Sequence, residues 1–111
     1  AISNQLYSIQ TATASTTQTQ AGGTAITAAA VAVTTANAND AVRLPKGYAG
    51  LEIFIANLSA NDLDVFPAVG DTIFPSAADA KIDHAASKNA VYKVLKVTAA
   101  GAATWYQLLS A

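Results

Sequence analysis

Residues 51–58 have the sequence LEIFIANL, and this stretch decides the fold class. An extended chain turns alternate side chains to opposite faces. The apolar residues here are Leu51, Ile53 and Ile55 on one face and Phe54, Ala56 and Leu58 on the other. Because both faces are mostly apolar, the stretch predicts a β-strand that is covered on both sides.

Short apolar segments separated by turn residues continue on both sides of this strand. The expected strands are 41–44, 63–66, 72–75, 90–98 and 103–109. A further strand is expected at 24–35, where the apolar residues shift from even to odd positions, as a β-bulge would explain. Residues 76–89 are polar and Ala-rich, and they could hold one helical turn. Strands about ten residues apart with turns between them predict an all-β fold, either a small β-sandwich or a barrel of jelly-roll type.

The subunit core is expected to come from the larger apolar side chains of these strands. The residues assigned to it are Leu51, Ile53, Ile55, Val65, Ile73, Val91, Leu95 and Trp105. Many of the remaining apolar residues are alanines, which fill little volume, and a domain of about 100 residues hides only about two thirds of its extended-chain surface. A single chain would therefore be marginally stable, and oligomerisation is a common remedy for small scaffolds.

The composition excludes several classes of protein. The 111 residues are enough for one small domain, and the net charge of −1 with 12% charged residues excludes a nucleic-acid-binding protein that relies on a basic surface. The chain has no cysteine, which excludes a disulfide framework, a zinc ribbon and a thiol nucleophile. No apolar run reaches the roughly 18 residues of a membrane span. The N-terminus shows neither the basic nor the apolar segment of a secretory signal.

The charges divide the chain into two regions. Residues 1–39 contain no Lys, Arg, Asp or Glu, and every charge lies from Asp40 onward. This predicts an uncharged N-terminal arm with the first strand at 1–39 and a β-sandwich or barrel body at 40–111. The arm could be a disordered tail, but such tails are usually charged or Pro-rich, and its many threonines suit a pleated surface. An arm that becomes ordered against a neighbouring subunit is the preferred interpretation.

Candidate catalytic and metal-binding residues are few. His84 lies beside Asp83, but adjacent residues of a strand point to opposite faces, so the two do not form a dyad. None of the possible nucleophiles Ser59, Ser76 and Ser87 lies in a nucleophile-elbow sequence. His84 is therefore expected at the surface or at an interface, and the sequence predicts neither an enzyme nor a cofactor.

The pair Asp62-x-Asp64 superficially matches the start of a calcium loop. A calcium loop also needs a glycine at a fixed position and several further oxygen ligands, often including a bidentate glutamate. Neither follows here, so we expect solvated turn carboxylates and no metal site.

Seven aromatic residues of the body allow two interpretations. They are Tyr48, Phe54, Phe66, Phe74, Tyr92, Trp105 and Tyr106. Such residues more often form a core or a subunit interface, because each brings a large buried area. The other interpretation is a surface that stacks on sugar rings.

One stretch has a recognisable pattern. It begins with Leu44-Pro45 and Gly50, continues through Ile53 and Ile55, and ends in the run Asn57-Leu58-Ser59-Ala60-Asn61-x-Leu63-x-Val65-Phe66-Pro67-Ala68-x-Gly70-Asp71-x-Ile73. This pattern resembles a module that is widespread in virion proteins of tailed phages and prophages. The later strand 91–98 and Thr104-Trp105 fit the end of the module, so the resemblance covers about residues 40–109. The module has no active-site residues to carry over.

The resemblance implies a capsid decoration (cement) protein on the exterior of the virion. Such proteins are commonly trimers seated between capsomers, so the implied partners are the major capsid protein and further copies of this chain, without nucleic acid or membrane. The residues expected to contact the capsid or a neighbouring subunit are Ile2, Leu6, Tyr7 and Ile9. The alternative is a head-fibre or tail-tip adhesin domain in which Tyr48, Tyr92 or Tyr106 stacks on host surface glycans.

Overall fold

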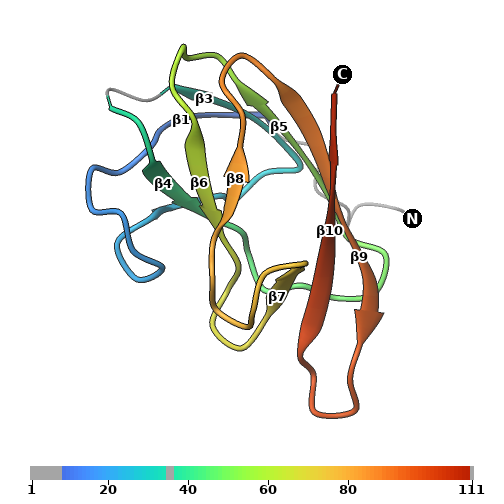
Figure 1. Ribbon diagram of the computed structural model, residues 1–111. Helices are drawn as coiled ribbons and strands as arrows, with labels where there is room; N and C mark the ends of the chain where they lie inside the picture. Colours follow the sequence, from blue (N-terminus) through green and yellow to red (C-terminus); the bar gives the residue numbers. More distant parts are fainter. Residues whose placement is uncertain (1–8, 35–36, 111) are drawn as a thin grey trace.

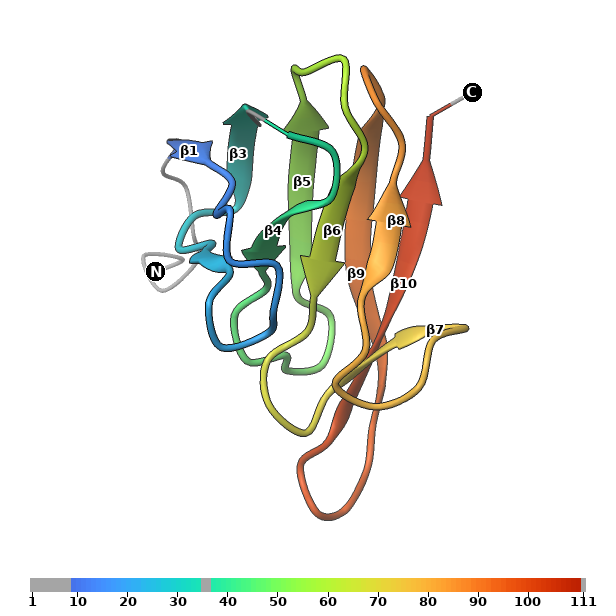
Figure 2. The same ribbon diagram turned by 60° about the vertical axis from the view of Figure 1, so that its left-hand side comes forward.

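The computed structural model describes residues 9–34 and 37–110, and these residues form two β-sheets. The six-stranded sheet has the order β1-β3-β5-β9-β10-β7, with β1 (Ile9–Thr13), β3 (Ala30–Thr34), β5 (Glu52–Asn57), β9 (Asn89–Val97), β10 (Ala103–Leu109) and β7 (Thr72–Phe74). The four-stranded sheet has the order β2-β4-β6-β8, with β2 (Thr24–Ala25), β4 (Asp40–Arg43), β6 (Leu63–Phe66) and β8 (Ile82–His84). Figures 1 and 2 show the two sheets as separate layers. The expectation of an all-β fold is confirmed, and the layers are those of a small sandwich.

The first six strands alternate between the layers as the chain proceeds (Figure 1). As a result β1, β3 and β5 run parallel in one sheet, and β2, β4 and β6 run parallel in the other. The antiparallel strand pairs of the described residues are β5 with β9, β9 with β10, and β6 with β8. A jelly roll is built from antiparallel Greek keys, so these mixed sheets differ from the expected type. Parallel neighbours need a crossover, and here a strand of the opposite sheet supplies it instead of a helix.

The described part of the N-terminal region belongs to the sandwich. Strands β1 and β3 form one end of the six-stranded sheet, and Ala12, Ile26 and Val33 are buried in the shared core. Residues 9–34 therefore pack as part of the body, and position 39 marks no structural boundary among the described residues. Small alanine and threonine side chains suffice to build β1 and β3, because the backbone of these strands makes the polar contacts by pairing with neighbouring strands.

Polar side chains hold the loop between β1 and β2 against the four-stranded sheet. Gln18 Nε2 donates to Asp40 Oδ1 at 3.3 Å, and Gln20 Nε2 donates to Pro67 O at 2.9 Å. Arg43 returns the contact by donating to Gln20 O at 3.0 Å. Gln18 and Gln20 thus tie this loop to β4 and to the loop that follows β6.

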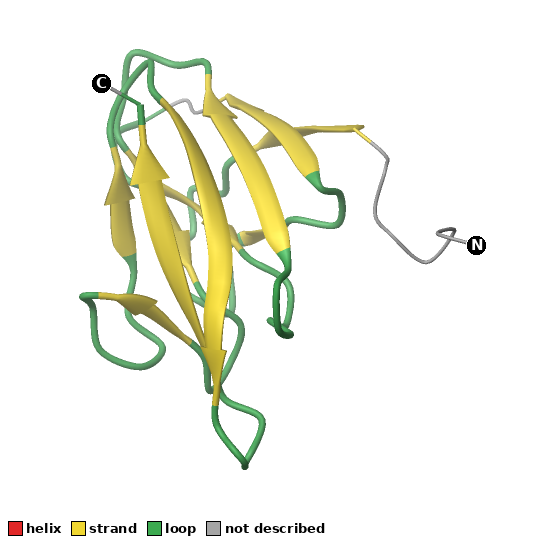
Figure 3. Ribbon diagram, turned by 90° about the vertical axis from the view of Figure 1, so that its right-hand side faces the viewer, coloured by secondary structure: helices red, strands yellow, loops and turns green. Residues whose placement is uncertain are grey.

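Two local expectations are wrong. The segment 24–35 is not one bulged strand: β2 and β3 lie in different sheets, and the change in parity marks the crossing between them. The segment 76–89 holds no helical turn in the structure, but contains the short strand β8, which pairs with β6. Figure 3 shows only strands and loops among the described residues.

The core lies between the sheets. Six of the residues assigned to it are buried there: Leu51, Ile53, Ile55, Val65, Ile73 and Trp105. The assignments of Val91 and Leu95 are wrong, since Val91 is half-buried and Leu95 is 63% exposed. Strand β9 has apolar residues on both faces and turns the other set, which includes Tyr92 and Val94, into the core. A shift of one residue exchanges the two faces of a strand, and the larger Tyr92 takes the inner side.

Candidate functional site

The outer face of the six-stranded sheet carries a row of apolar side chains that runs from one side of the sheet to the other. Its members are direct neighbours in register: Ile9 pairs with Ala30, Ala30 with Phe54, Phe54 with Val91, and Val91 with Leu108. We call these five residues the apolar row. Side chains alternate between the two faces of a strand, and the neighbours of each member along its own strand point inward. The five members of the row therefore point outward, on the same face of the sheet.

Exposure is greatest at the two ends of the apolar row. Ile9 is 81% exposed and Leu108 is 64% exposed, whereas Val91 and Ala30 in the middle are half-buried. The inner members are partly covered by lateral neighbours on both sides. The end members have such a neighbour on one side only, so the row exposes apolar area mainly at its ends.

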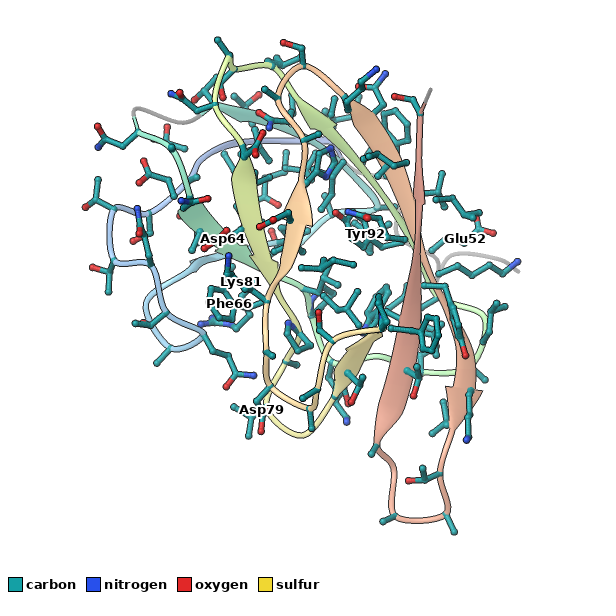
Figure 4. All side chains as sticks on the ribbon, in the orientation of Figure 1. Glu52, Asp64, Phe66, Asp79, Lys81 and Tyr92 are labelled. Carbon is teal, nitrogen blue, oxygen red and sulfur yellow. The ribbon has the colours of Figure 1, made fainter. Side chains whose placement is uncertain are left out.

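A second row lies beside the first on the same face. Lys93 pairs in register with Glu52 on one side and with Tyr106 on the other, and Tyr106 pairs with Phe74. The Lys93 Nζ and Glu52 Oε2 atoms are 3.0 Å apart, in an exposed ion pair. The rings of Phe74 and Tyr106 lie 5.5 Å apart with their planes tilted by 31°. Figure 4 shows Glu52 on the opposite side of the molecule from Asp64 and Lys81.

The other half of this face has no charge. The outward residues of β1 and β3 are threonine, alanine and isoleucine: Ile9, Thr11, Thr13, Ala30, Ala32 and Thr34. A neutral surface loses little hydration energy on contact with another protein, whereas buried charges must be paired. The outer face is thus suited chemically to protein contact.

His84, expected at the surface or an interface, is completely buried instead. Its Nε2 lies 2.7 Å from Lys88 O, which can only accept, so Nε2 carries the hydrogen. Nδ1 then accepts from the Tyr92 hydroxyl at 2.8 Å. Burial lowers the pKa of His84, with a smaller opposing effect of the Lys88 hydrogen bond. Both ring nitrogens are engaged, and through Tyr92 the His84 ring links β8 to the six-stranded sheet.

The serines that could serve as nucleophiles have structural contacts. Ser76 Oγ donates to Lys81 O at 2.8 Å, and Ser59 Oγ donates to Asn61 O at 3.0 Å. Ser87 Oγ donates to Ser59 O at 3.3 Å. These bonds lie in the turns between strands and account for the position of the three hydroxyls.

The acidic residues considered for calcium are separated by their contacts. Asp62 Oδ1 accepts the backbone N–H of Ala86 at 2.9 Å, while Asp64 Oδ1 lies 3.2 Å from Lys81 Nζ. Burial raises the pKa of Asp64 although Lys81 lowers it, and hydrogen bonds to Asp83 and Asp64 raise the pKa of Lys81. Within residues 9–34 and 37–110, no group of three or more His, Cys, Asp and Glu side chains could hold a metal ion.

Asp71, part of the recognisable pattern, is a buried structural centre. Its carboxylate accepts the backbone N–H groups of Gly47 at 3.0 Å and Ala103 at 2.9 Å, and it also pairs with Lys46. Gly70 before it has a positive φ of 88°, a conformation that glycine adopts without steric cost. The Gly-Asp pair therefore joins the turn before β7 to the start of β10. The sequence contains this motif, but its contacts could be seen only in the fold.

The aromatic residues divide between core and surface. Tyr92 and Trp105 are fully buried and Phe66 is nearly so. Tyr48, Phe54 and Phe74 are exposed. A buried Tyr92 cannot stack on a glycan, so that part of the adhesin hypothesis is wrong. Of the predicted contact residues, Ile9 lies at the exposed start of β1, while Ile2, Leu6 and Tyr7 lie outside the described residues.

Sequence reasoning missed the apolar row, although its signal is present. Strands β5, β9 and β10 carry large apolar residues at both parities, as the sequence of β5 already indicated. What the sequence could not supply is the register that aligns Phe54, Val91 and Leu108 across three strands.

Comparison with known proteins leaves the family open. No protein-family model matches the chain. No curated protein and no solved structure gives a significant match. The described residues contain no helix with the length and apolar character needed to cross a bilayer.

Proposed function

We propose that this chain is a structural virion protein, a capsid decoration (cement) protein that binds the outer capsid surface as a homotrimer and stabilises the head. The observation that carries the proposal is the apolar row on an outer face whose β1 and β3 strands carry no charge. Contiguous apolar patches on a protein surface often mark sites of contact with another protein. The resemblance of residues 40–109 to virion modules supplies the kind of partner.

The site chemistry supports binding over catalysis. The buried His84 and Asp71 both serve to connect elements of the sandwich. A decoration protein needs many identical contacts repeated by symmetry, and avidity then makes a weak single contact strong. Ile2, Leu6, Tyr7 and the exposed Ile9 are the proposed contacts of the N-terminus with the capsid or a neighbouring subunit.

Binding to phage heads tests this function. Heads of the phage or prophage that encodes the chain, prepared without it, would be mixed with the purified protein and sedimented. We expect the protein to sediment with the heads and to raise the temperature at which they release DNA. Phe54→Lys places a charge in the middle of the apolar row and should weaken binding. The control is Leu58→Lys, at an apolar residue outside the row that is more exposed than Phe54 (63% against 41%). Failure of the unmodified protein to sediment with the heads would contradict the function.

The N-terminal contacts have their own test. A chain that begins at Ile9 keeps every described strand. It should fold normally, as judged by circular dichroism, and bind the heads more weakly. Unchanged binding would remove Ile2, Leu6 and Tyr7 from the proposed contacts.

A head-fibre or tail-tip adhesin domain is the second candidate. The observation that favours it is the ring pair of Phe74, which is 58% exposed, and Tyr106. Exposed aromatic rings can stack on sugars, and Tyr48 is also exposed. A glycan array distinguishes the two functions: a cement protein should bind no glycan, and an adhesin should lose binding in Phe74→Ala.

A further inference from the structure

The two ends of the apolar row lie at open backbone edges of the same sheet. At one end, β1 is the last strand of the six-stranded sheet, and the described residues place no strand beyond it. Ala14 N donates to Thr34 O at 2.8 Å, so the alternation of a strand turns the backbone groups of Thr11 away from β3. Strand β1 therefore presents the backbone groups of Thr11 outward, while Thr13 O further along the same edge accepts from Thr24 Oγ1 at 2.7 Å.

At the other end, β10 is longer than its neighbour. Strand β7 pairs only with Thr104, Trp105 and Tyr106, and the described residues place no strand in that sheet beside Gln107, Leu108 and Leu109. Ser110 N donates to Asn89 O at 2.7 Å on the β9 side. By the same alternation, the backbone groups of Gln107 and Leu109 point away from β9 and towards the open lane.

Within residues 9–34 and 37–110, the sequences of the two edge segments lack the usual protection against pairing with another chain. Natural edge strands are blocked by charged side chains, proline, bulges or covering loops. Strand β1 has the sequence IQTAT, and the end of β10 has the sequence QLL, so neither contains a charge or a proline. Two such edges can meet without electrostatic repulsion.

We propose that a second copy of this chain occupies these edges, with β1 of one subunit pairing beside residues 107–109 of β10 in the next. The pairing would bring Ile9 of one subunit next to Leu108 of the other, so that the two most exposed ends of the apolar row cover each other. The six-stranded sheets would continue from subunit to subunit. This contact rests on the proposed function, in which several copies of the chain assemble, and it names the surface that joins them.

The strand directions agree with a closed ring. Strands β1, β3 and β5 are parallel, and the direction reverses at β9 and again at β10, so β10 runs parallel to β1. Rotation about an axis along the strands preserves this direction and pairs β10 with β1 of the next subunit in parallel. Such a contact uses two different surfaces, and a heterologous contact forms a ring when the rotation closes.

Engineered cysteines test the contact in solution without any capsid. The chain has no cysteine of its own, so Ile9→Cys and Leu108→Cys introduce the only thiols. The two sites are four strand spacings apart within one chain, about 19 Å. A disulfide needs Cα atoms within about 7 Å, so any bond between the two sites joins different chains.

We expect a mixture of the two single variants to form disulfide-linked dimers that contain one chain of each kind. The double variant should form covalent oligomers under mild oxidation. The matched control is Leu58→Cys, mixed with Ile9→Cys, which should form few heterodimers although the exposure of Leu58 is similar to that of Leu108. Equal heterodimer yields for both mixtures, or disulfides only between two Ile9→Cys chains, would overturn the proposal.

A second variant separates this contact from folding and from capsid binding. Leu108→Lys places a charge at an exposed position and should leave the circular dichroism spectrum unchanged while shifting the native mass to the monomer's 11.2 kDa. A multimer that survives both Leu108→Lys and Ile9→Lys would overturn the contact. Disulfide-linked oligomers from a protein that does not bind heads would support the contact and contradict the capsid function.

Discussion

The hydroxyl of Tyr92 lies 2.8 Å from Nδ1 of His84, and this hydrogen bond joins β9 of the six-stranded sheet to β8 of the four-stranded sheet. Gln107 on β10 extends the link by donating to the Tyr92 hydroxyl at 2.8 Å and to Asp83 O at 2.9 Å. Figure 4 shows Tyr92 between the layers. The chain's one histidine is thus part of a buried polar network between two sheets whose shared core is mainly apolar.

The stability of the protein should fall in mild acid because of His84. Burial lowers its pKa below the ordinary 6.5, so below that pH the unfolded chain binds a proton that the folded chain does not. The contribution of neutral His84 is complete above about pH 6.5 and is lost as the pH falls through the lowered pKa of the folded state. Urea unfolding between pH 8 and pH 5 measures this slope. His84→Gln has no titrating ring, and its free energy of unfolding should vary less over the same range.

Tyr92→Phe should destabilise the fold by about 1–3 kcal/mol, because it leaves His84 Nδ1 and Gln107 Nε2 without their shared partner. Burial also raises the pKa of the Tyr92 hydroxyl, so this group stays protonated and able to donate. Chemical denaturation gives the change in free energy. The control is Tyr48→Phe, at an exposed residue, which should change stability by less than about 0.5 kcal/mol. Equal effects of the two substitutions would contradict the role given to the network.

Asp71→Asn should destabilise the sandwich by about 1–3 kcal/mol. The carboxylate accepts from two backbone N–H groups and pairs with Lys46, and an amide of the same shape offers one oxygen and a competing donor. The matched substitution Asp83→Asn affects an exposed ion pair with Lys81, and such pairs contribute about 0–1 kcal/mol. Thermal unfolding of the two variants, compared at one pH above 6.5, tests the difference.

Gly47→Ala should destabilise the protein by about 1–3 kcal/mol through overpacking. A methyl group at this position would lie 2.6 Å from Ala103 Cβ, closer than real contacts allow, and 3.0 Å from Val94 Cγ2, which is a tight contact. The double variant Gly47→Ala with Ala103→Gly removes the closer of these atoms. The double variant should lose less free energy of unfolding than the two single variants lose in sum. A purely additive loss would show that the contact with Ala103 does not limit the size of residue 47.

Much of the local structure could be predicted from the sequence. The alternation in 51–58 predicted β5 and its inward residues Ile53 and Ile55, and the breakers around Pro67 and Gly70 separated β6 from β7. These predictions rest on local physics: the period of two in a strand and the conformations that glycine and proline allow. The inner face of β9 was predicted wrongly, because Val91 and Leu95 are as apolar as the Val94 that is buried.

The candidate site depended on contacts between distant segments. The apolar row joins residues from five strands, and His84, Tyr92 and Gln107 meet across two sheets. The sequence by itself determined that the chain forms short strands, that its first 39 residues bring no charge, and that no thiol chemistry is possible. The tertiary structure alone decided which face of each strand is buried, which strands run parallel, and where the sheet edges stay open. The physical reason is that a strand's pattern records only its own two faces, whereas register and layer order arise from pairing between segments far apart in the chain.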